Sequence, residues 1–206
     1  MTARRSPVRL ANVVRTLPHR GYGVARETVR DSQRWRLLEG MVEATARHGY
    51  AGATVAEVIV FAGVSRKAFY EHFTDKEDCF LAAYDVVSDR MIAQLVAAGS
   101  EHASGPARRR AYVIGYLAAL DRNLAVARVF TVDVLGAGRR VLERRDVVNR
   151  RFADHLFGDS QLDMTRRLAV VGGVNAVVAS ELLSREPQLL ALGESLSEFV
   201  QAALRP

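Results

Sequence analysis

Apolar residues recur along this chain at the spacing of amphipathic helices, and no stretch shows the strict alternation of a half-buried strand. The first long helix is predicted to begin at an N-cap formed by Asp31 or Ser32 and to end at Gly49. Its inward face is predicted to consist of Leu38, Met41, Val42 and Thr45. The pattern therefore predicts an all-α fold.

Helical periods continue beyond a break at residues 100–106, in which Gly105 and Pro106 suit the start of a new helix. Turn signals such as Asn123 separate the helices that follow. Those helices are predicted at residues 112–120, 124–135, 141–157, 164–183 and 189–204. Together they predict a large C-terminal helical domain over residues 81–206.

The most specific local pattern lies in residues 54–76, where a short helix, a turn and a second short helix are predicted. Thr54 is a good N-cap, and Glu57 follows it at the spacing of a capping box. Gly63 tolerates the left-handed conformation that ends the first helix, and Ser65 caps the second. The arrangement predicts a helix-turn-helix.

The second short helix is predicted to have two distinct faces. Arg66, Lys67 and Tyr70 project outward, and the inward positions are Ala68, Phe69 and Phe73. A recognition helix brings its N-terminal residues to base edges in the major groove, where Arg66 and Lys67 can both donate to guanine O6 and N7. We therefore interpret residues 65–72 as a recognition helix within a DNA-binding domain of residues 32–80.

A contiguous set of motifs surrounds this helix. They are Gly49-Tyr50, Thr54-Val55, Ala62-Gly63-Val64-Ser65, Phe69-Tyr70-Glu71-His72-Phe73 and Asp75-Lys76-Glu77. In these residues and spacings the chain resembles the DNA-binding domain of the TetR family of bacterial transcriptional regulators. The resemblance implies a homodimeric repressor that binds a palindromic double-stranded DNA operator and is released by a small molecule.

The resemblance also implies which side chains hold the DNA backbone. Thr54, Tyr70, His72 and Lys76 match family positions that contact phosphates, and each carries a suitable donor. His72 has the alternative role of capping the recognition helix, and Ala68 either touches a thymine methyl group or simply packs. The predicted DNA-binding set is Thr54, Ser65, Arg66, Lys67, Ala68, Tyr70, His72 and Lys76.

Some positions depart from the family pattern. Ile59 stands where a small residue normally lets two helices approach, and we expect the smaller Thr45, which replaces an aromatic residue, to compensate. Val60 and Phe61 follow where polar residues are common, so we expect them to be unusually exposed.

The formal net charge of +6 is concentrated near the N-terminus. Residues 1–36 contain nine Arg but only Glu27 and Asp31 as acidic residues, whereas the rest of the chain is close to balanced. Residues 1–31 are predicted to be a flexible basic arm. This arm either lies along DNA phosphates or is a solvated tail.

Small apolar residues cover nearly every face of residues 168–183. A helix of this kind is expected to meet another subunit, and the resemblance implies that residues 189–204 complete the dimer contact. The alternative is a wholly internal helix of a monomer. A ligand chamber is expected in the same domain, although each residue assigned to it is also a plausible core residue. The candidates for this apolar or amphipathic ligand are Tyr112, Tyr116, Phe130, Asp133, Phe152 and Asn175.

Other classes of protein are disfavoured by what the sequence contains. The single cysteine, Cys79, lies in an apolar run and excludes an intrachain disulfide, and the five His show no metal-binding spacing. We expect no catalytic site, no metal and no cofactor. Without a long apolar run or a signal peptide, we expect a cytoplasmic protein that does not bind membranes. The remaining alternative is an architectural or adaptor helix-turn-helix protein without a small-molecule ligand.

Overall fold

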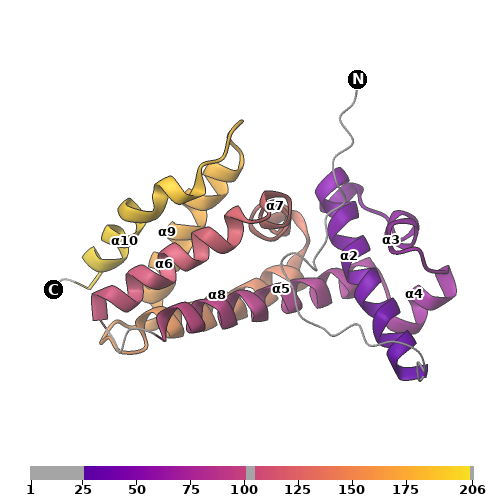
Figure 1. Cartoon of the computed structure of the whole chain (residues 1–206), viewed down its shortest axis with the longest axis horizontal. Helices are drawn as coiled ribbons and strands as arrows, with labels where there is room; N and C mark the ends of the chain where they lie inside the picture. The colour runs from indigo at the N-terminus through magenta and orange to yellow at the C-terminus, as the bar shows by residue number, and fades with distance from the viewer. Residues whose placement is uncertain (1–25, 101–104, 205–206) are drawn as a thin grey trace. The chain divides into compact units, whose positions relative to one another are not determined.

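The computed structural model describes residues 26–100 and 105–204. Regular structure within these ranges consists of helices, without a strand, as the sequence pattern predicts (Figure 1). The chain divides into unit 1, which ends at Val87, and unit 2, which begins at Ser88. Residues 1–25, which make up most of the predicted basic arm, lie outside the described residues.

Unit 1 contains the three helices that the sequence predicts there and the first part of a fourth. They are α2 (Arg26–Gly52), α3 (Val55–Ala62), α4 (Arg66–His72) and α5 (Lys76–Gly99), the last of which continues into unit 2. The predicted cap at Asp31 or Ser32 is wrong, because both residues lie inside α2. The first described side chains of this helix, residues 29–32, are all exposed, so its opening turns have no apolar face from which their start could be read.

The predicted end of the first helix at Gly49 is partly correct. Gly49 has a non-helical backbone with φ 68° and ψ 165°, and α2 bends there. Helical structure then resumes and ends at Gly52 instead. The positive φ explains why glycine occupies the bend, since a side chain would be strained in that conformation.

The core of unit 1 forms where α2 packs against the helix-turn-helix. The predicted inward positions of α2 are fully buried, and they are Leu38, Met41, Val42 and Thr45. Gly40 brings α2 unusually close to α3, because a Cβ at this position would lie 2.6 Å from the Val58 carbonyl oxygen and 3.1 Å from the Ala62 amide nitrogen. The close approach of the two helices thus depends on Gly40, which sequence analysis did not single out.

We predict that Gly40→Ala destabilises the chain by about 1–3 kcal/mol, because the new methyl group meets backbone atoms that cannot turn away. Gly136→Ala is the matched control, because a Cβ there meets nothing within 4 Å. Urea unfolding followed by circular dichroism measures both. An unchanged midpoint for Gly40→Ala would contradict the tight contact.

Unit 2 follows the predicted helical segments closely. It contains the end of α5, α6 (Gly105–Asp121), α7 (Leu124–Thr131), η1 (Asp133–Gly136), α8 (Arg139–Phe157), α9 (Met164–Leu182), η2 (Leu189–Leu192) and α10 (Gly193–Ala202). Two predicted α-helices, at residues 124–135 and 189–204, each combine an α-helix with a 3₁₀ turn. Apolar spacing does not distinguish these forms over a single turn. Side chains of Asn123 and Asp163 cap α7 and α9.

The core of unit 2 is apolar and draws on most of its helices. Its fully or almost fully buried side chains are Leu117, Phe157, Val178, Leu182, Leu189 and Val200.

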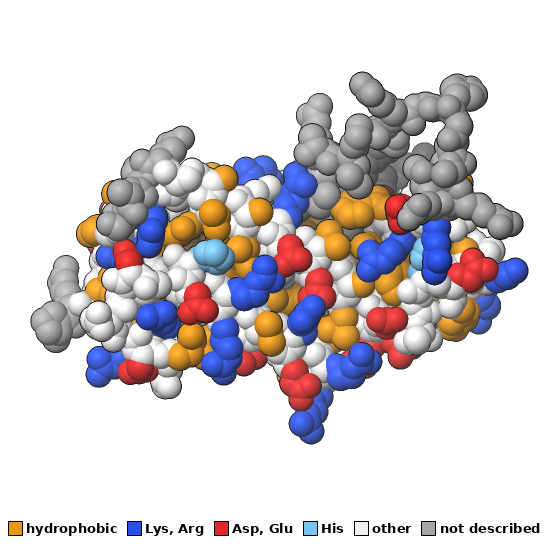
Figure 2. Space-filling view, turned by 90° about the horizontal axis from the view of Figure 1, so that it is seen from below, with side chains coloured by type: hydrophobic (Ala, Val, Ile, Leu, Met, Phe, Trp, Pro, Cys, Tyr) orange, Lys and Arg blue, Asp and Glu red, His pale blue; other side chains and the backbone are white. Residues whose placement is uncertain are grey.

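On the face presented in Figure 2, basic and acidic side chains are interleaved rather than gathered by sign. Ion pairs between residues four apart occur along α8, where Arg139 Nε lies 2.7 Å from Glu143 and Arg150 Nε lies 2.9 Å from Asp146. Each such pair stabilises a helix by only about 0.3–0.5 kcal/mol.

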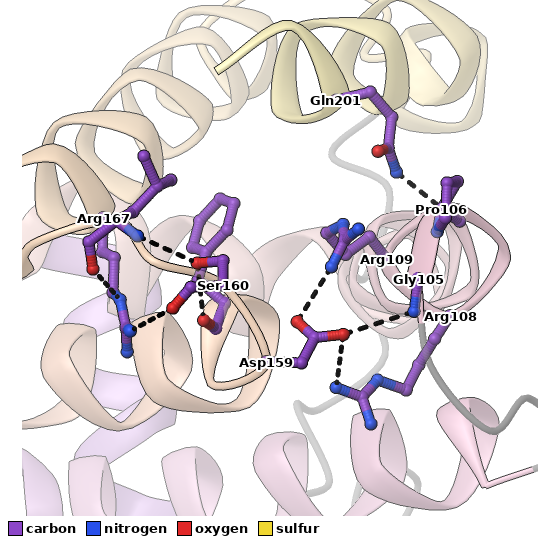
Figure 3. A network of polar contacts seen from close by, with 10 residues as sticks. Gly105, Pro106, Arg108, Arg109, Asp159, Ser160, Arg167 and Gln201 are labelled. Carbon is purple, nitrogen blue, oxygen red and sulfur yellow. Dashed lines mark hydrogen bonds and ion pairs between the residues drawn. The ribbon is translucent and has the colours of Figure 1, made fainter. Parts of the chain in front are cut away.

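Asp159 joins the turn after α8 to the start of α6 (Figure 3). Its carboxylate accepts a hydrogen bond of 2.9 Å from Arg109 Nη1 and one of 3.3 Å from the Gly105 N–H, and Arg108 Nη2 lies 3.3 Å away. Burial raises the pKa of Asp159, but the Gly105 N–H and the two guanidinium groups outweigh it and hold the pKa below its ordinary value of 3.8. The ionised form is therefore the one that stabilises the fold.

We predict that Asp159→Asn lowers the free energy of unfolding by about 1–3 kcal/mol at neutral pH. Because the folded pKa is lowered, the carboxylate contributes fully above pH 3.8 and its contribution is lost as the pH falls through the lowered pKa. The free energies of unfolding of the wild type and of Asp159→Asn should therefore converge in acid. Urea unfolding at a series of pH values will measure this. Asp154→Asn is the control, since this carboxylate is 60% exposed and its contact with Arg167 is a long one of 3.4 Å. A difference between wild type and Asp159→Asn that did not depend on pH would contradict the assignment.

Among the described residues, no helix combines the length and the apolar character needed to cross a bilayer.

Candidate nucleic-acid interface and ligand cavity

The start of α3 is fixed by the predicted capping box. The Glu57 N–H donates to Thr54 Oγ1 over 3.2 Å, and the Thr54 N–H donates to Glu57 Oε2 over 2.9 Å. These hydrogen bonds, first the one from the backbone and then the one from the hydroxyl of Thr54, lower the pKa of Glu57. Thr54 is exposed, but its hydroxyl is already engaged with Glu57. A phosphate contact by Thr54 therefore has to share this hydroxyl.

The turn between α3 and α4 has the predicted conformation. Gly63 adopts φ 61° and ψ 41°, the left-handed form that ends a helix. Ser65 Oγ accepts a 3.1 Å hydrogen bond from the Ala68 N–H and so caps α4. Arg36 Nη1 donates to the Gly63 carbonyl over 3.4 Å. The direction in which α4 leaves the turn is thus set by backbone conformation, by a side-chain cap and by a guanidinium group from α2.

Helix α4 has the two predicted faces. Ala68, Phe69 and Phe73 are buried, whereas Tyr70 is 53% exposed and the Lys67 side chain 87% exposed. Arg66 is exposed and has no acidic partner in the part of the chain that the structure describes. Lys67 is 3.8 Å from Glu71, which is a weak contact for a solvated pair. The outward face therefore presents two cationic side chains and a phenol.

Lys76 is more deeply engaged in the fold than the sequence suggests. Its ammonium donates to the Tyr50 carbonyl over 2.8 Å and to the Ala53 carbonyl over 3.0 Å, and lies 4.4 Å from the centroid of the Tyr50 ring. These contacts tie the start of α5 to the connection between α2 and α3. An ammonium has three donors, so a phosphate contact by Lys76 would have to use the remaining one.

We predict that Lys76→Met destabilises the chain by about 1–3 kcal/mol, because two carbonyl groups lose a charged donor while the aliphatic stem is retained. Lys67→Met is the matched control and should leave the unfolding midpoint unchanged. Thermal and urea unfolding in the absence of DNA measure both. Equal midpoints for the two variants would show that the Lys76 contacts carry no stability.

His72 lies at the end of α4 in a setting that disfavours its charged form. Its Nε2 atom is buried and has no hydrogen-bond partner among the residues described. Burial lowers the pKa of His72, and the charges of Arg30 and Arg34 lower it further. The imidazole is consequently neutral at pH 7, and a phosphate contact would have to come from Nδ1.

Two arginines of α2 lie beside the recognition helix and are not among the eight residues of the predicted DNA-binding set. Arg30 Nη2 is 3.5 Å from the Glu71 carbonyl, and the guanidinium of Arg34 lies 5.5 Å from the centroid of the Phe73 ring. Positive charge at a helix C-terminus is favourable because the carbonyl groups there are exposed. The spacing of four residues between Arg30 and Arg34 is the sequence signal, but it indicates one helix face only once α2 is known to begin before them.

Unit 2 contains a small cavity between α5, α6, α8 and α9. It brings together four of the predicted ligand residues, which are Tyr112, Tyr116, Phe152 and Asn175. Phe130 and Asp133 do not line it. Phe130 is half-buried in α7, and Asp133 lies in η1, where burial raises its pKa more than nearby Arg128 lowers it.

Cys79 is fully buried, and its thiol lies 3.7 Å from the Leu37 carbonyl oxygen. Burial strongly raises the pKa of this thiol, so it remains protonated and is a poor nucleophile. Within the described ranges, no group of three or more His, Cys, Asp or Glu side chains is arranged to hold a metal ion.

Residues 37–83, which include the whole helix-turn-helix, match the family model described as bacterial regulatory proteins of the tetR family. This segment of the chain, and not its whole length, matches the TetR family. The TetR-family segment is similar to the HTH-type transcriptional repressor AcnR of Corynebacterium diphtheriae, with 44% identity over 59 residues. That match covers 29% of this chain and 31% of AcnR, so it is confined to less than a third of either protein.

Two solved structures share the fold over most of this chain. The fatty acid degradation regulator FadR of Bacillus halodurans has a TM-score of 0.72 at 19% identity, covering 82% of this chain and 98% of FadR. FadR of Bacillus subtilis, solved in complex with stearoyl-CoA, has a TM-score of 0.72 at 16% identity over the same shares. At such identities the likeness shows the fold alone.

Proposed function

We propose that this chain is a TetR-family regulator, a homodimeric transcriptional repressor that binds a palindromic operator and is released from it by a small molecule. The observation that carries the proposal is the outward face of α4, which presents Arg66, Lys67 and Tyr70 from a helix whose start is fixed by Ser65. A rigid helix with exposed donors near its N-terminus suits entry into a major groove. AcnR, named as a transcriptional repressor, matches over this part of the chain.

The roles within this interface divide into base reading and positioning. Arg66 and Lys67 read base edges, and Tyr70 and Thr54 position the helix on the phosphates. Ser65 acts chiefly as the cap of α4, and the burial of Ala68 supports packing rather than thymine contact. His72 and Lys76 contribute through Nδ1 and the third ammonium donor respectively.

The dimer forms through residues 168–183 and 189–204. Apolar side chains on these segments are exposed in the single chain: Val177 by 43%, Leu183 by 57%, Leu190 by 54% and Phe199 by 45%. A Cβ at Gly172 would meet nothing within 4 Å, so this part of α9 leaves room for a neighbour. Exposed apolar side chains grouped on neighbouring segments are typical of a subunit interface.

Release from DNA requires a ligand that binds one conformation better than another. The cavity of unit 2 is the site for it, with Tyr112, Tyr116, Phe152 and Asn175 in its wall. The similarly folded FadR of Bacillus subtilis was solved with stearoyl-CoA, so an acyl-CoA is a ligand class against which this cavity has to be tested. The alternative function, an architectural DNA-binding protein, shares the α4 interface but needs no cavity.

We predict that Arg66→Ala weakens binding to the operator by about 1–3 kcal/mol and relaxes base preference, because one donor pair to a guanine is lost. The operator is obtained by selecting duplexes from a random pool with the wild-type chain. Binding is then measured by fluorescence anisotropy at several salt concentrations. Selected duplexes should carry two inverted half-sites about one helical turn apart and bind two chains.

Arg139→Ala is the matched control for Arg66→Ala, because this 92% exposed arginine lies on α8 in unit 2. Its operator affinity should equal that of the wild type. Unchanged affinity and base preference for Arg66→Ala would refute the assigned reading face. Selection of single half-sites, with one chain per duplex, would refute the dimer.

A further inference from the structure

The wall of the cavity in unit 2 is dominated by apolar side chains. Its apolar part consists of Ile92 and Leu95 from α5, Val113 from α6, Leu156 from α8, and Val171 and Val174 from α9. Among the aromatic residues, the rings of Tyr116 and Phe152 meet edge to face with centroids 6.0 Å apart. An occupant would therefore gain mostly from burial of its own apolar surface.

Charge is scarce in this wall. None of the described residues that line the cavity is Lys, Arg, Asp or Glu, and His155 is the one imidazole among them. A carboxylate or phosphate placed in an apolar wall without a paired cation loses its hydration with little in return. The cavity therefore discriminates against anions, including the several phosphate charges of a CoA ester.

Tyr116 and Asn175 bring linked hydrogen-bonding groups to the wall of the cavity. Tyr116 donates from its hydroxyl to Asn175 Oδ1 over 2.9 Å, and Asn175 Nδ2 donates to Asn149 Oδ1 over 3.2 Å. These two hydrogen bonds fix the Asn175 amide and leave it a second N–H on its nitrogen and a second lone pair on its oxygen. One polar group of a ligand can be held here, and most of the other side chains in the wall are apolar.

The cavity is small. The volume open to a water-sized sphere is about 50 Å³. The whole hollow, including its mouth toward solvent, has a volume of about 550 Å³. For comparison, an apolar protein cavity of about 150 Å³ binds benzene. Even a single ring must therefore push side chains outward, and a long acyl chain is far too large.

We infer that the cavity takes a small uncharged molecule, no larger than about one ring, that is apolar over most of its surface and has one polar group for Asn175. The inference rests on the proposed function in treating this cavity as the ligand site of a repressor. It adds the chemical class of the ligand, and it excludes acyl-CoA esters.

The test uses the full chain and three ring-sized probes that differ in one group. Benzamide is uncharged with a polar group, benzoate has nearly the same shape with a negative charge, and toluene lacks the polar group. Titration calorimetry should show benzamide binding at least about 10-fold more tightly than benzoate, because a carboxylate is costly to bury here. Toluene should bind more weakly than benzamide, and stearoyl-CoA should not bind in this cavity.

Asn175→Leu tests the polar contact, since the side chains are similar in size but Leu has no donor or acceptor. The affinity for benzamide should fall about 3–10-fold, which is the expected effect of losing a hydrogen bond, while the affinity for toluene does not fall. Val171→Ala is the matched control and should change both affinities in the same direction. Circular dichroism confirms that each variant is folded. Should Asn175→Leu not fold, the ranking of probes on the wild-type chain still decides the ligand class.

The inference is overturned if benzoate or stearoyl-CoA binds as tightly as benzamide, or if benzamide fails to bind up to its solubility. Operator binding separates this failure from failure of the proposed function. Release of the selected operator by stearoyl-CoA would uphold the repressor and refute the ligand class. Binding of benzamide by a chain that retains no duplex would uphold the ligand class and refute the repressor.

Discussion

The ammonium group of Lys76 holds together the part of unit 1 on which the reading helix depends. It binds the carbonyl groups of Tyr50 and Ala53, which lie just before α3 and belong to the end of α2 and to the linker. An unpaired carbonyl at a helix end is costly to bury, and here one side chain satisfies two of them. The capping box of Thr54 and Glu57, which fixes where α3 begins, follows at once in the chain. Lys76 thus holds the segment that precedes α3, and the left-handed turn at Gly63, with the Ser65 cap and Arg36, then sets the direction of α4.

How much of this could be predicted depended on how far apart in the sequence the interacting groups are. Thr54 with Glu57 and Ser65 with Ala68 are local pairs, and the sequence predicted both caps. The contacts of Lys76 and the close approach at Gly40 join segments that the sequence separates, so no local pattern indicated them. The N-terminal turns of α2 were missed for a different reason, because their described side chains are exposed and leave no apolar period.

The cavity shows the same limit in unit 2. Helical spacing identifies residues that face inward but does not say which of them share a neighbour. Phe130 and Asp133 were plausible ligand residues on that basis, yet the cavity is built from α5, α6, α8 and α9 and not from α7 or η1. Tyr116 and Asn175 were also chosen by pattern, and their hydrogen bond joins α6 to α9 across 59 residues of sequence. The packing of the helices determines which inward-facing residues contact one another, and the spacing of residues along one helix does not encode that packing.

The small volume of the cavity bears on how a ligand would act on DNA binding. A ligand shifts a conformational equilibrium only through its different affinities for the two states. A chamber of about 50 Å³ hardly binds a ring-sized molecule as it stands, so binding and expansion would have to occur together. Ile92 and Leu95, which form part of the wall, belong to α5, the helix that begins at Lys76. Expansion at this wall would therefore act on the same helix whose first residue holds the carbonyl groups before α3. In this scheme the ligand prefers the expanded conformation simply because the cavity of the closed conformation is too small to hold it. No further structural feature is needed to give the two conformations different affinities.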